Sequence, residues 1–103
     1  LFHFEHLNIN KAFICASGVS LKKGISDFNL EEAITRKKII SISQTVYVAT
    51  DSSKFNKDVA IQVCPLEEVD VIITDNALSK KTIQHFSDKG IEIKLVNTSE
   101  EHQ

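Results

Sequence analysis

Short apolar runs alternate with longer amphipathic stretches along the chain. The runs at residues 45–50 (TVYVAT) and 69–74 (VDVIIT) are rich in β-branched and aromatic residues, and they are followed by Asp51 and Asp75. This composition is typical of buried strands, so we expect both faces of these strands to be covered. Residues 11–16 (KAFICA) form a similar apolar run and predict the first strand.

Two further runs predict strands with more exposure. Residues 91–96 (IEIKLV) alternate apolar and polar side chains, which predicts a final, half-exposed strand. The weaker run at residues 59–63 (VAIQV) comes just before Cys64 and Pro65. Because proline cannot donate to a strand ladder, this run is expected to end there or to lie at an edge.

The first amphipathic stretch has a clear helix start. Asn29 can act as the N-cap, and Glu32, three positions later, can reach back to the capping residue. The predicted helix covers about residues 30–43. Its apolar positions spread around most of the cylinder, so we expect the helix to be well covered rather than to lie on the surface.

The second predicted helix begins after Ser79 as its N-cap and ends at Gly90, with Ile83 and Phe86 on its inward side. Strands and helices therefore alternate in the order of a parallel α/β sheet. The predicted fold class is α/β, with a mostly parallel, Rossmann-like sheet and flanking helices. Two helices are few for four or five strands, and residues 1–9 lack a start signal. We therefore expect a domain truncated on its N-terminal side.

Length and composition limit the possible classes of protein. The 103 residues provide for one domain, and the 25% of charged residues with a net charge of −2 give no positive field toward nucleic acid. No run is long and apolar enough to span a membrane, and no signal peptide is recognisable. Cys15 and Cys64 cannot form a disulfide framework, so we expect a cytoplasmic protein in which both are core side chains.

Polar residues follow the predicted strands where an open α/β sheet binds ligands, beyond the carboxyl ends of its strands. Ser17-Gly18 follows the first strand and could hold an anion or a polyol. Asp51-Ser52-Ser53-Lys54 follows the second, and its charges and hydroxyls suit a phosphorylated sugar. The alternative is a local turn in which Asp51 and the serines bond their own backbone, and spacing alone does not separate the two.

Arg36 is a further candidate, because the run Arg36-Lys37-Lys38 could direct one cation into this crevice. The alternative is a solvated pair with Glu32, four residues earlier. His3 and His6 have no partners with metal-site spacing, so no metal site is predicted. No phosphate-binding P-loop, dinucleotide motif or serine-hydrolase motif is present, and no cofactor is expected.

Several linked motifs resemble the C-terminal effector-sensing domain of DeoR-family transcriptional repressors. They are KAFICASGVSLKKGISDFNLEEA, RKKII and VYVATDSSKFNKDVAIQVCPLEEVDVIITD, followed by DKGIE near the end. The resemblance covers about residues 11–96. It implies a domain similar to sugar-phosphate isomerases that senses a phosphorylated sugar, and an N-terminal helix-turn-helix that binds operator DNA. That DNA-binding unit is not present in this chain, so residues 1–103 are expected to be one partial sensing domain.

The resemblance to the isomerases also separates a sensor from an enzyme. Arg36 stands where those enzymes carry the catalytic glutamate, and a guanidinium cannot act as a general base. Lys54 matches their phosphate-contacting lysine. The resemblance therefore implies retained binding and lost proton transfer, with no catalytic residue. Departures from the family include Cys15 and Asn56, both at positions where glycine is frequent.

The main hypothesis is the effector-binding and oligomerising part of a DeoR-type repressor. Its expected partners are a phosphorylated sugar, further copies of itself, and operator DNA through the missing domain only. The expected ligand-binding residues are Ser17, Gly18, Arg36, Asp51, Ser53 and Lys54. A divergent sugar-phosphate isomerase, with Asp51 or Glu32 as its base, and an assembly module without a ligand remain alternatives.

Overall fold

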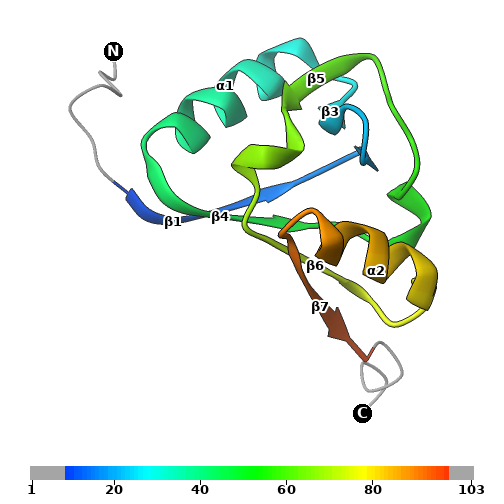
Figure 1. The fold of residues 1–103 in the computed structure, drawn as a ribbon. Coiled ribbons are helices and arrows are strands. Elements are labelled where there is room, and N and C mark those ends of the chain that lie inside the picture. Colours follow the sequence, from blue (N-terminus) through cyan, green and yellow to red (C-terminus); the bar gives the residue numbers. More distant parts are fainter. Residues whose placement is uncertain (1–8, 98–103) are drawn as a thin grey trace.

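The computed structural model describes residues 9–97. His3 and His6 lie outside the described residues. The elements are β1 (Ile9–Cys15), β2 (Gly18–Ser20), β3 (Gly24–Asp27), α1 (Leu30–Ser41), β4 (Ser43–Ala49), the 3₁₀ turn η2 (Ser52–Lys54), β5 (Ile61–Cys64), the 3₁₀ turn η3 (Leu66–Glu68), β6 (Val71–Asp75), α2 (Lys80–Asp88) and β7 (Glu92–Val96) (Figure 1).

The main sheet contains β1, β4, β6 and β7 in that order, and all neighbouring strands are parallel. This confirms the predicted α/β class and the four main strands. The strand order always moves in one direction across the sheet. Since connections between parallel strands are right-handed, such an order places every connection on the same face.

A second, antiparallel sheet of β2, β3 and β5 was not expected from the sequence. It contains the weaker run at residues 59–63 only in part, since β5 covers Ile61–Cys64. Gly24, the first residue of β3, has φ +77°. Its backbone lies so close to the end of β5 that an added Cβ would be 2.4 Å from the carbonyl oxygen of Cys64. Only glycine suits both requirements.

The hydrophobic core lies on one face of the main sheet. Ile14, Val48 and Ile72 are neighbours across β1, β4 and β6, and all three are buried. They pack in one cluster with residues of both helices and of the small sheet, for example Ala33, Val19 and Phe86. The list of the fully buried members is Val19, Ile25, Ala33, Val48, Ile72 and Phe86, each with 0% exposure.

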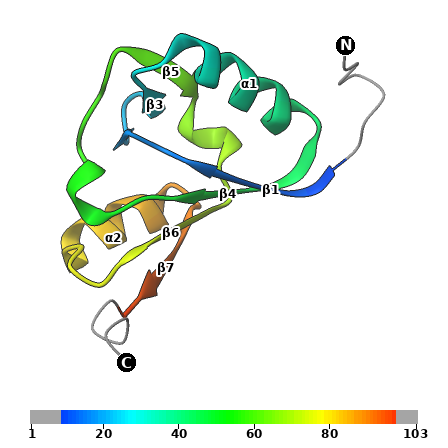
Figure 2. The same cartoon turned by 180° about the vertical axis from the view of Figure 1, so that it is seen from behind.

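Within residues 9–97 no helix or strand covers the opposite face of the main sheet at Phe13, so the prediction that both faces are covered was wrong for this part of the chain. Phe13 is 65% exposed and stacks on Tyr47 of the neighbouring strand, with 4.6 Å between ring centroids. Figure 2 shows the molecule from behind, with α1 on one side of the strands. A β-branched strand pattern does not distinguish one covered face from two, because the inward residues Val46 and Val48 are apolar in either case.

Helix α1 has the predicted N-cap, since Asn29 Oδ1 accepts the backbone N–H of Glu32 at 2.9 Å. It is less covered than expected: only Ala33 and Ile40 are buried, whereas Leu30 and Ile34 are 58% and 45% exposed. Several apolar residues of α1 therefore do not pack in the core formed by residues 9–97.

Helix α2 follows the prediction closely. Ser79 caps it by accepting the N–H of Thr82 at 3.1 Å, and Gly90 follows it with φ +87°. Phe86 is fully buried and meets Phe55 edge to face. Neither helix in residues 9–97 is long and apolar enough to cross a membrane.

The two cysteines differ in environment. Cys64 is buried, and desolvation raises the pKa of its thiol to about 12, with a further contribution from Glu68. Cys15 is exposed at the end of β1, so the expectation that it is a core side chain was wrong. It lies on the open face because its position has the same parity in the strand as Phe13.

Candidate functional site

The carboxyl ends of β1, β4 and β6 meet at one edge of the sheet. Thr50, just after β4, connects them: its hydroxyl donates to the carbonyl of Ala16 at 3.1 Å, and its N–H donates to the carbonyl of Ile73 at 3.0 Å. The segment after β1 and the turn after β4 are thereby held next to one another. All six predicted site residues except Arg36 lie in these two segments, and Arg36 of α1 is linked to Ser17 of the first segment through Asp27 of β3.

A buried carboxylate, Asp27, organises the first group. Asp27 is 5% exposed at the end of β3. Its Oδ1 accepts the hydroxyl of Ser17 at 3.1 Å and the N–H of Phe28 at 2.8 Å, and its Oδ2 accepts the guanidinium of Arg36. The structure thus brings Ser17 and Arg36 together, but through a carboxylate that the sequence did not single out.

Arg36 makes a second ion pair, with Glu32 at 3.0 Å. The predicted i, i+4 pair is therefore confirmed. Two carboxylates surround one guanidinium, so this group has no excess positive charge for an anion. Only 22% of the Arg36 side chain is exposed, against 58% for Glu32.

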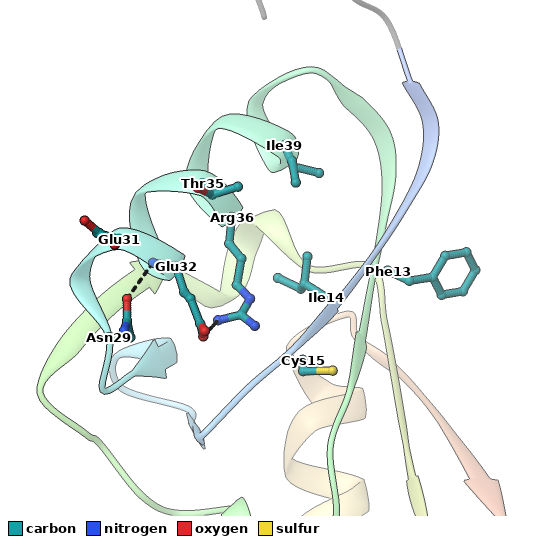
Figure 3. A pocket seen from close by; sticks show the side chains of 9 residues that line it. All are labelled: Phe13, Ile14, Cys15, Asn29, Glu31, Glu32, Thr35, Arg36 and Ile39. Atoms are coloured by element: carbon teal, nitrogen blue, oxygen red, sulfur yellow. Dashed lines mark hydrogen bonds and ion pairs between the residues drawn. The ribbon is translucent and has the colours of Figure 1, made fainter. Parts of the chain in front are cut away.

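A cleft of about 510 Å³ lies between α1 and the free edge of β1. Figure 3 shows Arg36 and Ile14 projecting into the space between the helix and the strand, while Phe13 points away from the helix. The lining residues are Phe13, Ile14, Cys15, Asn29, Glu31, Glu32, Thr35, Arg36 and Ile39. Of the six predicted ligand-binding residues, this cleft contains Arg36.

The second group forms the turn η2. Asp51 caps it, with Oδ1 accepting the N–H of Ser53 at 2.9 Å and also the hydroxyl of Ser53. The hydroxyl bond of Ser53 lowers the pKa of Asp51 most, and the N–H of Ser53 and the charge of Lys54 lower it further. The local-turn interpretation of Asp51 is therefore correct as a description of its contacts. It leaves the ammonium of Lys54 without an ion pair to any residue in 9–97.

Asp75 fixes this turn from the neighbouring strand. Its Oδ2 accepts the N–H of Ser52 at 2.8 Å and its Oδ1 accepts the N–H of Ala77 at 3.0 Å. Hydrogen bonds from Ser52, first from its N–H and then from its side chain, lower the pKa of Asp75. The carboxylates of Asp51 and Asp75 are therefore held ionised, and both accept hydrogen bonds from nearby residues.

Gly18 has a packing role in this structure. A Cβ at Gly18 would lie 2.6 Å from the carbonyl oxygen of Lys57 and 2.6 Å from the Ser26 hydroxyl. The N–H of Asn56, which has φ 62°, donates to the carbonyl of Val19 at 2.7 Å. The loop after η2 thus packs directly on β2, and the Asn56 position is left-handed, as expected of a place where glycine is frequent.

Sequence reasoning missed Asp27 and Asp75 as members of this region. Asp75 directly follows the apolar run at residues 69–74, just as Asp51 follows the run at residues 45–50. The same signal that made Asp51 a candidate could therefore have indicated Asp75. Asp27 had no such signal, since its partners Ser17 and Arg36 are ten and nine residues away on different elements. Within residues 9–97, no group of three His, Cys, Asp or Glu side chains could hold a metal ion.

Comparison with known proteins identifies the family to which this sequence is similar. The model of the DeoR C terminal sensor domain matches residues 3–76, more than half of the chain. The putative aga operon transcriptional repressor of Escherichia coli O157:H7 is 27% identical over 95 residues, 92% of the chain and 34% of the relative. The HTH-type transcriptional regulator IolR of Bacillus subtilis is 33% identical over 91 residues, 88% of the chain and 36% of the relative.

A third relative, the lactose phosphotransferase system repressor of Staphylococcus epidermidis, is 37% identical over 73 residues, 70% of the chain. The chain spans about a third of the length of the first two relatives, 34% and 36%. The extent of the family match, together with the parallel sheet and its motif-bearing turns, leads to one conclusion: the chain belongs to the DeoR family of transcriptional regulators and corresponds to their C-terminal sensor domain.

Proposed function

We propose that this chain is the effector-sensing part of a transcriptional repressor and that it binds a phosphorylated sugar at the carboxyl edge of its sheet. The observation that carries the proposal is the turn η2. There Lys54 has no ion-pair partner within residues 9–97, beside Asp51 and Ser53 at the end of β4. An ammonium can hold a phosphate, and exposed carboxylate and hydroxyl groups can bond sugar hydroxyls.

Ser17, Gly18 and Arg36 contribute differently to the proposed site. Gly18 keeps the loop after η2 close to β2. Ser17 and Arg36 fix the segment after β1 through Asp27. A ligand phosphate would bind Arg36 only by competing with Asp27 and Glu32. Lys54 is therefore the expected phosphate contact, whereas Arg36 lines the separate cleft between α1 and β1.

The same geometry supports sensing without catalysis. Arg36 cannot accept a proton, and Glu32 is engaged with it. Asp51, the other candidate base, has a pKa below its ordinary value of 3.8 because of the bonds from Ser53. A general base works best with a pKa near the operating pH, so Asp51 is a weak one.

The proposed protein is longer than this chain and acts in the cytoplasm as an oligomer. The relatives are regulators about three times as long, of which the chain covers 34–36%. The open face of the sheet and the free edge of β1 supply surfaces on which further elements of the same domain would pack. In this proposal a DNA-binding unit outside residues 1–103 contacts the operator, and the ligand shifts the balance between two arrangements of the assembly.

Isothermal titration calorimetry on the full-length gene product tests the proposal. The ligands are ribose 5-phosphate, glucosamine 6-phosphate and a wider panel of sugar phosphates, with inorganic phosphate and the unphosphorylated sugars as controls. We expect one phosphorylated sugar to bind and its unphosphorylated form not to. Absence of binding across the panel would favour an assembly module, and turnover of a bound sugar phosphate would favour an isomerase.

A further inference from the structure

The turn η2 is bonded to another element through Asp75, the last residue of β6. The bonds inside the turn are local: the N–H of Lys54 donates to the carbonyl of Asp51 at 3.1 Å, and the N–H of Phe55 donates to the carbonyl of Ser52 at 3.3 Å. In the part of the chain that the structure describes, Ser52 is the residue of η2 that bonds outside the turn, and its N–H donates to Asp75 Oδ2 at 2.8 Å. The turn keeps its shape by itself, but its direction relative to the sheet depends on Asp75.

Asp75 directs both of its oxygens to backbone donors. Besides the N–H of Ser52, it accepts the N–H of Ala77, at Oδ1 and 3.0 Å. The bonds from Ser52 are the first cause of the lowered pKa of Asp75, so the carboxylate is ionised at neutral pH. Hydrogen bonds to an ionised acceptor are shorter and stronger than those between neutral groups. Asp75 is therefore suited to hold the turn rather than to contact a ligand.

Asp70 makes the same kind of bond at the opposite edge of the sheet. It stands just before β6, and its Oδ2 accepts the N–H of Val46 in β4 at 2.8 Å. Val46 also pairs with Ala12 of β1 in the sheet, whereas Ser52 lies beyond the last residue of β4. The bond to Asp70 therefore reinforces a strand that the sheet already holds, and the bond to Asp75 fixes a turn.

We propose that Asp75 is a positioning residue of the sugar-phosphate site, which holds Ser52 and thereby directs Lys54 toward the ligand. Three residues complete one turn of a 3₁₀ helix, so Ser52 and Lys54 belong to a single turn. A rotation of that turn would move the Lys54 side chain with it. Because a preorganised group loses less entropy on binding, a fixed turn raises the affinity for the phosphate.

This inference rests on the proposed function and adds to it a residue that does not touch the ligand. Calorimetric titration of the full-length gene product with the sugar-phosphate panel, beginning with ribose 5-phosphate and glucosamine 6-phosphate, tests it. Asp75→Ala should weaken binding of the sugar phosphate by about tenfold, because the turn loses its acceptor. Asp75→Asn keeps one carbonyl oxygen as an acceptor and should weaken binding less.

Asp70→Ala is the matched control, because it removes an acceptor of the same kind from the other edge of the sheet. It should lower stability in urea unfolding about as much as Asp75→Ala and leave the affinity for the sugar phosphate unchanged. Hydrogen exchange measured by mass spectrometry gives a readout without ligand. The peptide that covers residues 51–55 should exchange faster in Asp75→Ala and at the wild-type rate in Asp70→Ala.

A double variant separates positioning from direct contact with the ligand. If Asp75 acts through Lys54, the variant with both Lys54→Ala and Asp75→Ala should bind as weakly as Lys54→Ala alone, whereas independent contacts give losses that add.

Additive losses, an equal loss of affinity in Asp75→Ala and Asp70→Ala, or unchanged exchange at residues 51–55 would each overturn this inference and leave the proposed function standing. Absence of binding of the whole panel to the wild type, or wild-type affinity in Lys54→Ala, would overturn the proposed function and the inference with it. Circular dichroism confirms that each variant is folded.

Discussion

Two groups at the same edge of the sheet contain the same kinds of side chain and differ in burial. The first joins Asp27, Ser17 and Arg36, and its carboxylate is 5% exposed. The second joins Asp51 and Ser53 beside Lys54, and Asp51 is exposed. In the first group the cation bonds the acid directly. In the second the hydroxyl and N–H of Ser53 bond the acid, and the ammonium has no ion pair within residues 9–97.

The difference in burial between Asp27 and Asp51 explains why Arg36 stabilises the fold whereas Lys54 is available to a ligand. A buried carboxylate needs its charge compensated, so Arg36 is committed to Asp27. The exposed carboxylate of Asp51 is solvated by water and needs no such compensation. Lys54 can therefore bind a phosphate without leaving an unpaired buried charge. The residue types alone do not separate these two roles, but their burial does.

Removal of Asp27 should have the largest effect. Asp27→Ala leaves the Ser17 hydroxyl, the Phe28 N–H and part of the Arg36 guanidinium without their acceptor. Loss of one partner of a buried ion pair costs about 3–5 kcal/mol, so we expect a free energy of unfolding lower by about 3 kcal/mol. Urea unfolding followed by circular dichroism measures it.

Ser53→Ala is the control for the exposed group. It removes the hydroxyl that bonds Asp51 at the surface and should change the free energy of unfolding by less than about 0.5 kcal/mol. Equal losses in Asp27→Ala and Ser53→Ala would contradict the distinction between the two groups.

Gly18→Ala should have the next largest effect. The new Cβ would lie 2.6 Å from the Lys57 carbonyl oxygen, which belongs to the loop that follows η2. Overpacking of this kind costs about 1–3 kcal/mol. We expect a lower melting temperature in differential scanning calorimetry together with weaker sugar-phosphate binding, because the loop that follows η2 is displaced. An unchanged melting temperature would show that the loop adapts freely.

The smallest effect concerns pH. The bonds from Ser52 lower the pKa of Asp75 in the folded state below the ordinary value of 3.8. The ionised carboxylate therefore stabilises the fold above its unfolded-state pKa, and this contribution is lost as the pH falls through the folded-state pKa. Between about pH 4 and about pH 2, the wild type should lose more stability than Asp75→Asn. Parallel curves for the two proteins in acid-unfolding titrations would contradict the assignment.

The sequence predicted those parts of the fold that depend on local signals. The four parallel strands followed from β-branched runs, and Asn29 and Ser79 were correct N-caps because capping involves neighbouring residues. The antiparallel sheet was missed because β2 and β3 are only three and four residues long and carry Gly and Ser. Strands this short have no detectable period.

The candidate site shows the same limit. The local turn at Asp51 was one of two interpretations left open, and the sequence could suggest it because Asp51 and Ser53 bond each other two residues apart. The burial of Asp27 could not be predicted from the sequence, because it depends on the packing of β3 against α1. Coverage of the sheet was also wrongly predicted, since Phe13 and Tyr47 look alike in a sequence whether or not another layer covers them.

The most direct test of the central claim compares Lys54→Ala with Lys57→Ala in calorimetric titrations of the full-length gene product with the sugar phosphate that binds the wild type. Both lysines lie in the same segment, and only Lys54 belongs to η2. The account predicts that Lys54→Ala weakens binding by about tenfold or more while Lys57→Ala and the stability of both variants stay unchanged. Wild-type affinity in Lys54→Ala would contradict it.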